Sequence, residues 1–354
     1  MKKLVLACCV ALSLLAVGCG KKQSDAKAVS TGEKQELNLY TWSDYFPKEM
    51  LKEFTDATGI KVNETKYSTN EEMMAKLAAG GSGYDLVIPS DYAVQALIEQ
   101  KQLLPLDRST LSNFKNLDPK LLGLPYDKDN KYSLPVYWGT TGLGINKDVI
   151  KEPIDSWNAL FDPKYAGKIS MLNDARENFA IALKVMGKSL NDRDSADLKQ
   201  AGEKLKEQAK LVKSYDSESF DEKLRTGEAA LVHGYNGQLA KVVRDDPKKF
   251  AYIVPKEGAT RWVDNACIPA DAPHPKNAHV FLNYMLEAKN AAAMTNDAGY
   301  ASGNKAAQQF VDEKLLKDPN VYVPDDVMKR CEFMLDIGTA GPAMQKMFEE
   351  AKAK

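Results

Sequence analysis

The chain is poor in cysteine and histidine and has no excess of charge of either sign. Its 354 residues include five cysteines and three histidines, with 48 Lys and Arg against 49 Asp and Glu. Only Cys267 and Cys331 lie beyond the first nineteen residues, which excludes a disulfide framework. The balanced charge argues against a nucleic-acid binder, which normally carries a basic excess or stripe. With 44% hydrophobic and 27% charged residues, the composition indicates a soluble globular protein of about two domains.

The uncharged apolar run near the N-terminus is too short to span a bilayer. Lys2 and Lys3 precede fourteen apolar or small residues, Leu4–Val17, whereas a transmembrane helix needs about twenty. This pattern predicts a signal peptide over residues 1–18. Residues 16–19, Ala-Val-Gly-Cys, resemble the lipobox of bacterial lipoproteins, which implies cleavage before Cys19 and lipidation of its side chain. An ordinary secretory peptide is the alternative.

A polar segment separates this leader from the folded part. Residues 20–36 are rich in Lys, Gln, Ser and Ala without apolar periodicity, which predicts a flexible tether behind the lipidated cysteine, over residues 19–36. We therefore expect a lipid-anchored protein that acts in the periplasm or at the cell surface of a bacterium.

The folded part begins with strand and helix patterns in alternation. Strand patterns at 37–42, 60–67 and 86–88 are each followed by a helical pattern. Pro47 suits the first position of a helix and Gly59 its end, while Ser68 with Glu71, or Thr69 with Glu72, has capping-box spacing. Repeated βαβ units predict a parallel sheet covered by helices.

The middle of the chain changes character and then returns to the same pattern. Residues 105–135 are rich in Pro, Asp, Asn and Lys with little periodicity and lead into 136–146, which we interpret as a crossing between domains. Further strand and helix patterns follow. They predict an α/β fold of two lobes, each a mostly parallel sheet flanked by helices, with the ligand in the cleft between them. The first lobe is predicted over residues 37–144 plus about 265–305, and the second over 145–264 plus about 306–354.

Acidic and aromatic side chains recur together where the predicted strands end. Ligands of open α/β sheets bind at the carboxyl ends of the strands. The residues there are Trp42 to Tyr45, Ser90 to Tyr92, Asn173 to Glu177, Tyr235 with Asn236, and Trp262 to Asp264. Carboxylates attract ammonium groups, and aromatic faces attract cations and pack against alkyl chains. No His or Cys group has metal-ligand spacing. The pattern favours an elongated organic cation as the ligand.

Several of these stretches resemble the periplasmic spermidine/putrescine-binding proteins of ABC importers. They are Leu39-Tyr40-Thr41-Trp42-Ser43-Asp44-Tyr45, Tyr84-Asp85-Leu86-Val87-Ile88-Pro89-Ser90, Asp174-Ala175-Arg176-Glu177 and Trp262-Val263-Asp264. The likeness runs from about residue 37 to near the C-terminus, and implies a clamp that closes over a polyamine and delivers it to a membrane permease. The ligand-binding positions that it implies are Trp42, Ser43, Asp44, Tyr45, Ser90, Tyr92, Asp174, Glu177, Tyr235, Trp262, Asp264 and Tyr300.

The resemblance also implies roles for these residues. Asp264 is expected to pair with one terminal ammonium group, and Asp174 and Glu177 to hold the opposite end or a middle amine. Ser43 and Ser90 would add hydrogen bonds, and the methylenes would be sandwiched by the aromatic side chains of Trp42, Tyr45, Tyr92, Tyr235 and Trp262.

Two departures from the family pattern leave the preferred amine open. Tyr235 stands where spermidine binders carry a tryptophan, and Met334 where the family has a glutamine. Ser43-Asp44, in contrast, resembles the putrescine-preferring branch. We expect a monomer that accepts putrescine, spermidine or both.

Two alternative functions belong to the same architecture. An iron site favours adjacent tyrosines with His or a carboxylate, and an anion site favours Arg or helix N-termini. Gly299-Tyr300 supplies only one tyrosine, and the predicted strand ends supply few bases. A transferase would use Cys267, three residues after Asp264, although the apolar run around it favours a buried inert thiol. No triad or pair of catalytic carboxylates is evident. We therefore expect no enzymatic activity, no cofactor and no metal.

Overall fold

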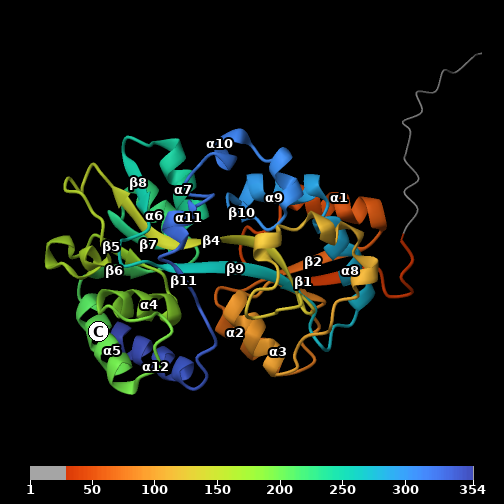
Figure 1. The fold of residues 1–354 in the computed structure, drawn as a ribbon, viewed down its shortest axis with the longest axis horizontal. Coiled ribbons are helices and arrows are strands. Elements are labelled where there is room, and N and C mark those ends of the chain that lie inside the picture. The colour runs from red at the N-terminus through yellow and green to blue at the C-terminus, as the bar shows by residue number, and fades with distance from the viewer. Residues whose placement is uncertain (1–28, 354) are drawn as a thin grey trace, which may run out of the picture.

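Two α/β lobes share one mixed β-sheet in the computed structural model, which describes residues 29–353. The strands follow the order β2-β1-β3-β9-β4-β7-β5-β6. Figure 1 shows β4 (Ser133–Asn146) and β9 (Thr260–Cys267) running from one lobe into the other. The predicted two-lobed α/β architecture is confirmed, although the two crossing strands pair antiparallel. The predicted signal peptide and the lipidated Cys19 lie outside the described residues.

The first lobe is built from the βα units that the sequence pattern predicts. In β1, β2 and β3 the strands are parallel. Thr69 accepts a hydrogen bond from the Glu72 amide while the Glu72 carboxylate accepts one from Ser68, so the second of the two capping alternatives is the one formed. The elements are β1 (Glu36–Thr41), α1 (Lys48–Thr58), β2 (Lys61–Lys66), α2 (Asn70–Ala78), β3 (Leu86–Val87), α3 (Asp91–Glu99), η1 (Arg108–Thr110), η2 (Ser112–Asn116) and η3 (Pro119–Leu121).

The second lobe repeats this arrangement around another parallel group of strands. Strand β5 pairs parallel with β6 and β7, and β8 joins β4 antiparallel. The elements are η4 (Trp157–Phe161), η5 (Pro163–Tyr165), β5 (Ile169–Met171), α4 (Ala175–Val185), α5 (Ser195–Ala209), β6 (Val212–Tyr215), α6 (Phe220–Thr226), β7 (Leu231–Tyr235), α7 (Asn236–Asp245) and β8 (Phe250–Ile253).

The C-terminal part of the chain visits both lobes. Helix α8 packs on β1, and α12 packs on α4 and α5. Between them, β11 lies parallel to β9 and leads back to the second lobe. The elements are α8 (Pro275–Met285), α9 (Ala288–Ala298), β10 (Ala301–Ser302), η6 (Lys305–Gln309), α10 (Glu313–Leu316), α11 (Asp325–Met328), β11 (Glu332–Phe333) and α12 (Ala340–Lys352).

The crossing between the lobes is a strand, and the irregular segment before it belongs to the first lobe. Leu106, Leu111 and Leu117, within the segment interpreted as the start of the crossing, are buried in the first lobe's core. Strand β4 itself pairs with β9 up to Thr140 and with β7 from Thr141 onward. The change of partner therefore occurs a few residues before the predicted boundary after residue 144.

The end of the predicted tether is bound to the first lobe. The Val29 amide donates to the Thr58 carbonyl. The Glu33 carboxylate accepts hydrogen bonds from the Lys276 and Asn277 amides, which are free donors at the N-terminus of α8. The prediction of a flexible tether through residue 36 is therefore too long at its C-terminal end. Within residues 29–353, no helix has the length and apolarity needed to cross a membrane.

Gly139 lies in β4 where the lobes meet and allows two side chains to approach the backbone. A Cβ atom there would lie 2.2 Å from Oδ1 of Asn236 and 2.6 Å from the Trp262 ring. Asn236 uses that oxygen to accept the Thr140 amide hydrogen bond. Overpacking of this kind typically costs about 1 to 3 kcal/mol, so we expect Gly139→Ala to lower the free energy of unfolding by that amount in urea denaturation.

A matched control is Gly341→Ala in α12. The nearest atom to its added Cβ would be 4.0 Å away, so stability should stay unchanged or rise slightly, because alanine favours the helix. Equal destabilisation by both substitutions would contradict the packing argument.

Candidate functional site

One pocket lies between the lobes and takes side chains from both. It encloses about 830 Å³ of space, including the part open to solvent. Loops after β1 and β3 contribute from the first lobe, the N-terminus of α4 and the loop after β6 from the second, and β9 from the crossing. Of the twelve predicted ligand-binding residues, eleven line it: Trp42, Ser43, Tyr45, Ser90, Tyr92, Asp174, Glu177, Tyr235, Trp262, Asp264 and Tyr300.

Asp44 is the predicted site residue that lies elsewhere. Its side chain is 82% exposed and stands 3.8 Å from the Lys66 ammonium group. The backbone at Asp44 has a φ of 56°, in the left-handed region, so the turn after β1 directs this carboxylate to solvent while Ser43 and Tyr45 face the pocket. The prediction of Asp44 as a pocket residue is corrected accordingly.

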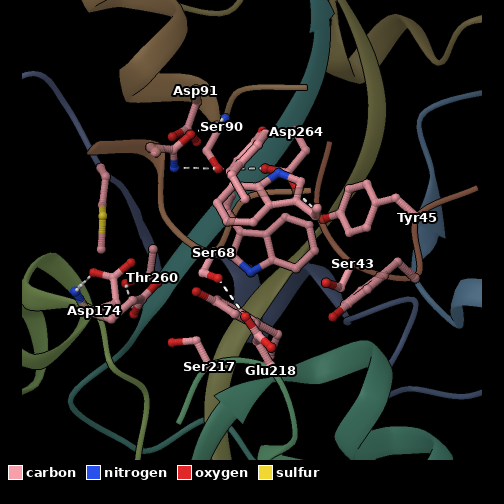
Figure 2. Close-up of a pocket in the computed structure, with 18 of the residues that line it drawn as sticks. Ser43, Tyr45, Ser68, Ser90, Asp91, Asp174, Ser217, Glu218, Thr260 and Asp264 are labelled. Atoms are coloured by element: carbon pink, nitrogen blue, oxygen red, sulfur yellow. Dashed lines mark hydrogen bonds between the residues drawn. The ribbon is translucent and has the colours of Figure 1, made fainter. Parts of the chain in front are cut away.

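The Asp264 carboxylate, on β9, is held by two hydroxyl groups. Ser90 donates to Oδ1 over 2.6 Å and Tyr45 donates to Oδ2, as Figure 2 shows. Asn70 in turn binds both the amide and the hydroxyl of Ser90. Burial raises the pKa of Asp264 to about 6, and the hydrogen bonds from Ser90 and Tyr45 oppose that rise. The carboxylate is thus oriented but has no positive partner within residues 29–353.

A second acidic group begins α4. Asp174 caps this helix by accepting the Glu177 amide hydrogen bond over 3.0 Å. Thr141 and Thr260 donate to the two carboxylate oxygens of Glu177 over 2.9 and 3.1 Å. Burial raises the pKa of Asp174, and the neighbouring carboxylates of Glu71 and Glu177 raise it further. In Figure 2 Asp174 lies apart from Asp264, beside Thr260.

Aromatic rings line the space between the two acidic groups. Trp262 meets Tyr300 and Tyr235 edge to face, with ring centroids 5.3 and 6.1 Å apart. The Trp262 indole N–H is buried without a hydrogen-bond partner among the described residues. Burial raises the pKa of Tyr45, Tyr235 and Tyr300 well above the usual value, so these phenols remain neutral. The walls can therefore pack against an alkyl chain and face cations without supplying any charge.

The lining is strongly acidic. Within the described chain it contains five carboxylate side chains, those of Asp91, Asp174, Glu177, Glu218 and Asp264, and neither lysine nor arginine. Asp91, Glu177 and Asp264 are buried, Asp174 is half-buried and Glu218 is exposed. Buried carboxylates are costly unless they are paired. An arrangement of this kind is complementary to a ligand that carries more than one positive charge along an apolar chain.

Some lining residues were not predicted as site residues. Asp91 lies between two predicted positions, and Gln238 lies three residues after Tyr235. Ser68 and Asn70 lie in the region that we interpreted as a helix cap, whereas Thr260 lies just before a predicted strand. Ser217 and Glu218 come from the loop after β6, for which the sequence carries no motif. Asp91 also holds the backbone of the crossing strand, because its Oδ2 accepts the Val263 amide hydrogen bond.

A hydrogen bond joins the two lobes at this pocket. The Ser68 hydroxyl, between β2 and α2, donates to the Glu218 carboxylate over 2.7 Å, and Figure 2 shows the pair facing each other. The Glu218 amide is itself held by Asp216. The lobes are therefore in contact across the pocket.

The residues of the alternative sites have different surroundings. Cys267 is fully buried in β9, and burial raises its pKa well above the usual value, which opposes formation of a nucleophilic thiolate. Cys267 and Cys331 are both free thiols. Among residues 29–353, no three His, Cys, Asp or Glu side chains gather as they would around a metal ion.

Comparison with known proteins identifies the family to which the chain belongs. Residues 49–322 match the family described as bacterial extracellular solute-binding protein. The chain belongs to this family of two-lobed binding proteins. It is 37% identical over 335 residues to "Spermidine/putrescine-binding periplasmic protein 1" of Haemophilus influenzae, covering 94% of this chain and 92% of that protein.

Two further comparisons agree with this assignment. The chain is 33% identical to the "Putrescine/cadaverine-binding protein" of Pseudomonas aeruginosa, covering 93% of this chain and 97% of that protein. The solved structure of a "Putative spermidine/putrescine ABC transporter from Listeria monocytogenes" superposes with a TM-score of 0.88 at 34% identity, over 90% of this chain and 99% of that one.

The raised pKa of Asp264 predicts a pH dependence of stability in the ligand-free protein. A carboxyl group whose pKa is higher in the folded state stabilises that state when protonated, so stability should fall as pH rises through about 6. Between pH 5 and 7.5, ionisation of Asp264 should lower the free energy of unfolding by about 1.4 kcal/mol. We expect Asp264→Asn to remove that loss in urea denaturation at the two pH values. The exposed Asp44→Asn should leave it in place, and an identical loss in both variants would contradict the assignment.

Proposed function

We propose that this protein captures putrescine, spermidine or both outside the cytoplasmic membrane and delivers them to an ABC permease. The observation that carries the proposal is the pocket lined by five carboxylates and several aromatic rings, without lysine or arginine among its described lining residues. Polyamines are the complement of such a surface, because they carry ammonium groups spaced by methylenes. The names of the relatives support the same ligand class.

The geometry gives each group a role in the proposed complex. One terminal ammonium replaces the missing positive partner of Asp264 and lies near the Ser90 and Tyr45 hydroxyls. Asp174 and Glu177 take the other end of the amine. Trp262 and Tyr235 pack against the methylenes between them. The chemistry is capture and release, with no covalent step.

The preferred amine depends on the acidic group of the second lobe. A carboxylate that is buried without an ammonium partner costs free energy, so the spacing of the charges in the ligand decides the affinity. Met334 lines the pocket as an apolar side chain at a position that could otherwise hold a hydrogen-bonding amide. A shorter diamine cannot contact both Asp174 and Glu177 directly, so water must bridge part of the distance.

Closure of the lobes is the step that a permease would recognise. Ligand in the pocket favours the closed form to the extent that it binds that form more tightly than the open one. In this proposal the protein acts as a monomer in the periplasm or at the cell surface, and Cys19 carries the lipid anchor.

Isothermal titration tests the proposed ligand class directly. We expect saturable one-to-one binding of putrescine or spermidine, and none of ornithine, phosphate or ferric citrate. Asp264→Asn should weaken binding at least about 30-fold, since truncating one partner of a buried charge pair typically costs about 2 to 5 kcal/mol. Asp44→Asn, whose side chain is exposed, should change the affinity little. Binding of ferric citrate or phosphate alone would contradict the proposal.

The hydrogen bond between Ser68 and Glu218 predicts an effect on ligand release. Because it joins the two lobes across the pocket, its loss should speed dissociation of the amine about two- to tenfold while the association rate changes little. Stopped-flow tryptophan fluorescence of Ser68→Ala, Glu218→Gln and the double variant measures this. If the two side chains act only through this hydrogen bond, the amine should dissociate from the double variant as fast as from either single variant. Multiplicative effects of the two substitutions on the dissociation rate would contradict the contact.

A further inference from the structure

Arg176 is a buried cation beside the acidic group of the second lobe, and the proposed function gives it no role. It lies in α4 between Asp174 and Glu177 and is 6% exposed. It is not among the residues that line the pocket. A charged side chain in such a position is expensive unless its surroundings compensate for the lost water. Its contacts therefore need an explanation.

These contacts connect three separate parts of the chain. The guanidinium carbon lies 5.0 Å from the ring centroid of Tyr92, which belongs to α3 in the first lobe. Nη2 donates over 3.1 Å to the carbonyl of Leu335, in the segment that follows β11 back toward the second lobe. An arginine over a tyrosine ring is an attractive cation–π contact, worth more when it is desolvated. One side chain of α4 thus contacts both the opposite lobe and the segment that follows β11.

Tyr92 carries this connection to the rest of the site. Its ring lines the pocket, and its hydroxyl donates over 3.0 Å to the Glu71 carboxylate in α2. It also follows closely after Ser90, which holds the Asp264 carboxylate. The two acidic groups of the pocket are therefore linked through Ser90, Tyr92 and Arg176, which are packed residues of both lobes.

We propose that Arg176 is a positioning residue that couples occupancy of the acidic group to closure of the lobes. Arg176 and Tyr92 belong to different lobes, so we expect their contact to be lost when the lobes open. The positive charge of Arg176 lowers the pKa of Asp174, against the raising effect of burial and of the Glu71 and Glu177 carboxylates, and so favours the ionised form that an ammonium group needs. The proposal rests on the proposed polyamine function and adds a residue that binds no ligand atom itself.

The charge effect has a definite sign. Asp174 is faced by Glu71 from α2, by Glu177 and Arg176 from its own helix, and by the neutral phenols of Tyr92 and Tyr235 from α3 and β7. Burial and the two glutamates raise the pKa of Asp174, and Arg176 lowers it. Removal of the guanidinium should raise this pKa further. At neutral pH the carboxyl would then hold its proton more often, and amine binding would weaken most at low pH.

The test compares Arg176→Gln, Arg176→Lys and Arg193→Gln with the wild-type protein. Arg193 is the matched control, because it donates to the neighbouring carbonyl of Asp336 but is exposed. Titration calorimetry with putrescine and spermidine at pH 6.5, 7.5 and 8.5 gives the affinities. Stopped-flow fluorescence gives the dissociation rates.

We expect Arg176→Gln to weaken binding at least tenfold at pH 6.5 and to recover much of that loss by pH 8.5, with faster dissociation throughout. Arg176→Lys keeps the charge but not the planar contact, so it should keep the wild-type pH profile and still dissociate faster. Arg193→Gln should match the wild type. If Arg176→Gln does not fold, the dissociation rate of Arg176→Lys remains as the test.

Two results would overturn the proposal. One is a loss of affinity in Arg176→Gln that is the same at every pH, which would indicate a merely structural role. The other is wild-type dissociation in both Arg176 variants. A wild-type protein that binds no amine would overturn the proposed function and this proposal with it, whereas wild-type binding with unaffected variants would overturn only the role of Arg176.

Discussion

The central constraint in this structure is a set of buried carboxylates that two lobes place around one pocket without a positive side chain in its described lining. Each of the main groups is held in position by neutral hydroxyls, which orient the charge but do not cancel it. Ser90 and Tyr45 do this for Asp264, and Thr141 and Thr260 do it for Glu177. A cationic ligand therefore completes the electrostatics of the protein, and the interface between the lobes is most favourable when that ligand is present.

The sheet places these groups. Strands β4 and β9 cross between the lobes as neighbours, so Thr141 and Thr260 stand close to the second lobe and Asp264 close to the first. Helix α4 presents Asp174 and Glu177 at its N-terminus, where the helix dipole favours negative charge. The same crossing brings Trp262 against Gly139, at a point where only glycine leaves room for the indole. Binding chemistry and domain architecture thus depend on the same two strands.

The sequence predicts the alternating elements, the two lobes and most of the pocket, because strand ends, caps and motifs are local signals. Gly59, for example, ends α1 in the left-handed conformation that glycine adopts readily. The sequence does not predict which way a side chain leaves a turn. It therefore suggests Asp44 as a pocket residue, although the left-handed backbone turns this side chain to solvent. Glu218 and the buried position of Arg176 depend on how the lobes meet, which is a tertiary property without a local pattern.

Proton release on ligand binding tests the account most directly. The pKa of Asp264 is about 6 in the ligand-free protein, and an ammonium group beside the carboxylate must lower it. Titration calorimetry with putrescine or spermidine at pH 6, in buffers of different ionisation enthalpy, measures the protons exchanged. The account predicts a net release of roughly half a proton or more at pH 6, which fades toward pH 8.5. Proton uptake, or no exchange at pH 6 despite tight binding, would contradict it.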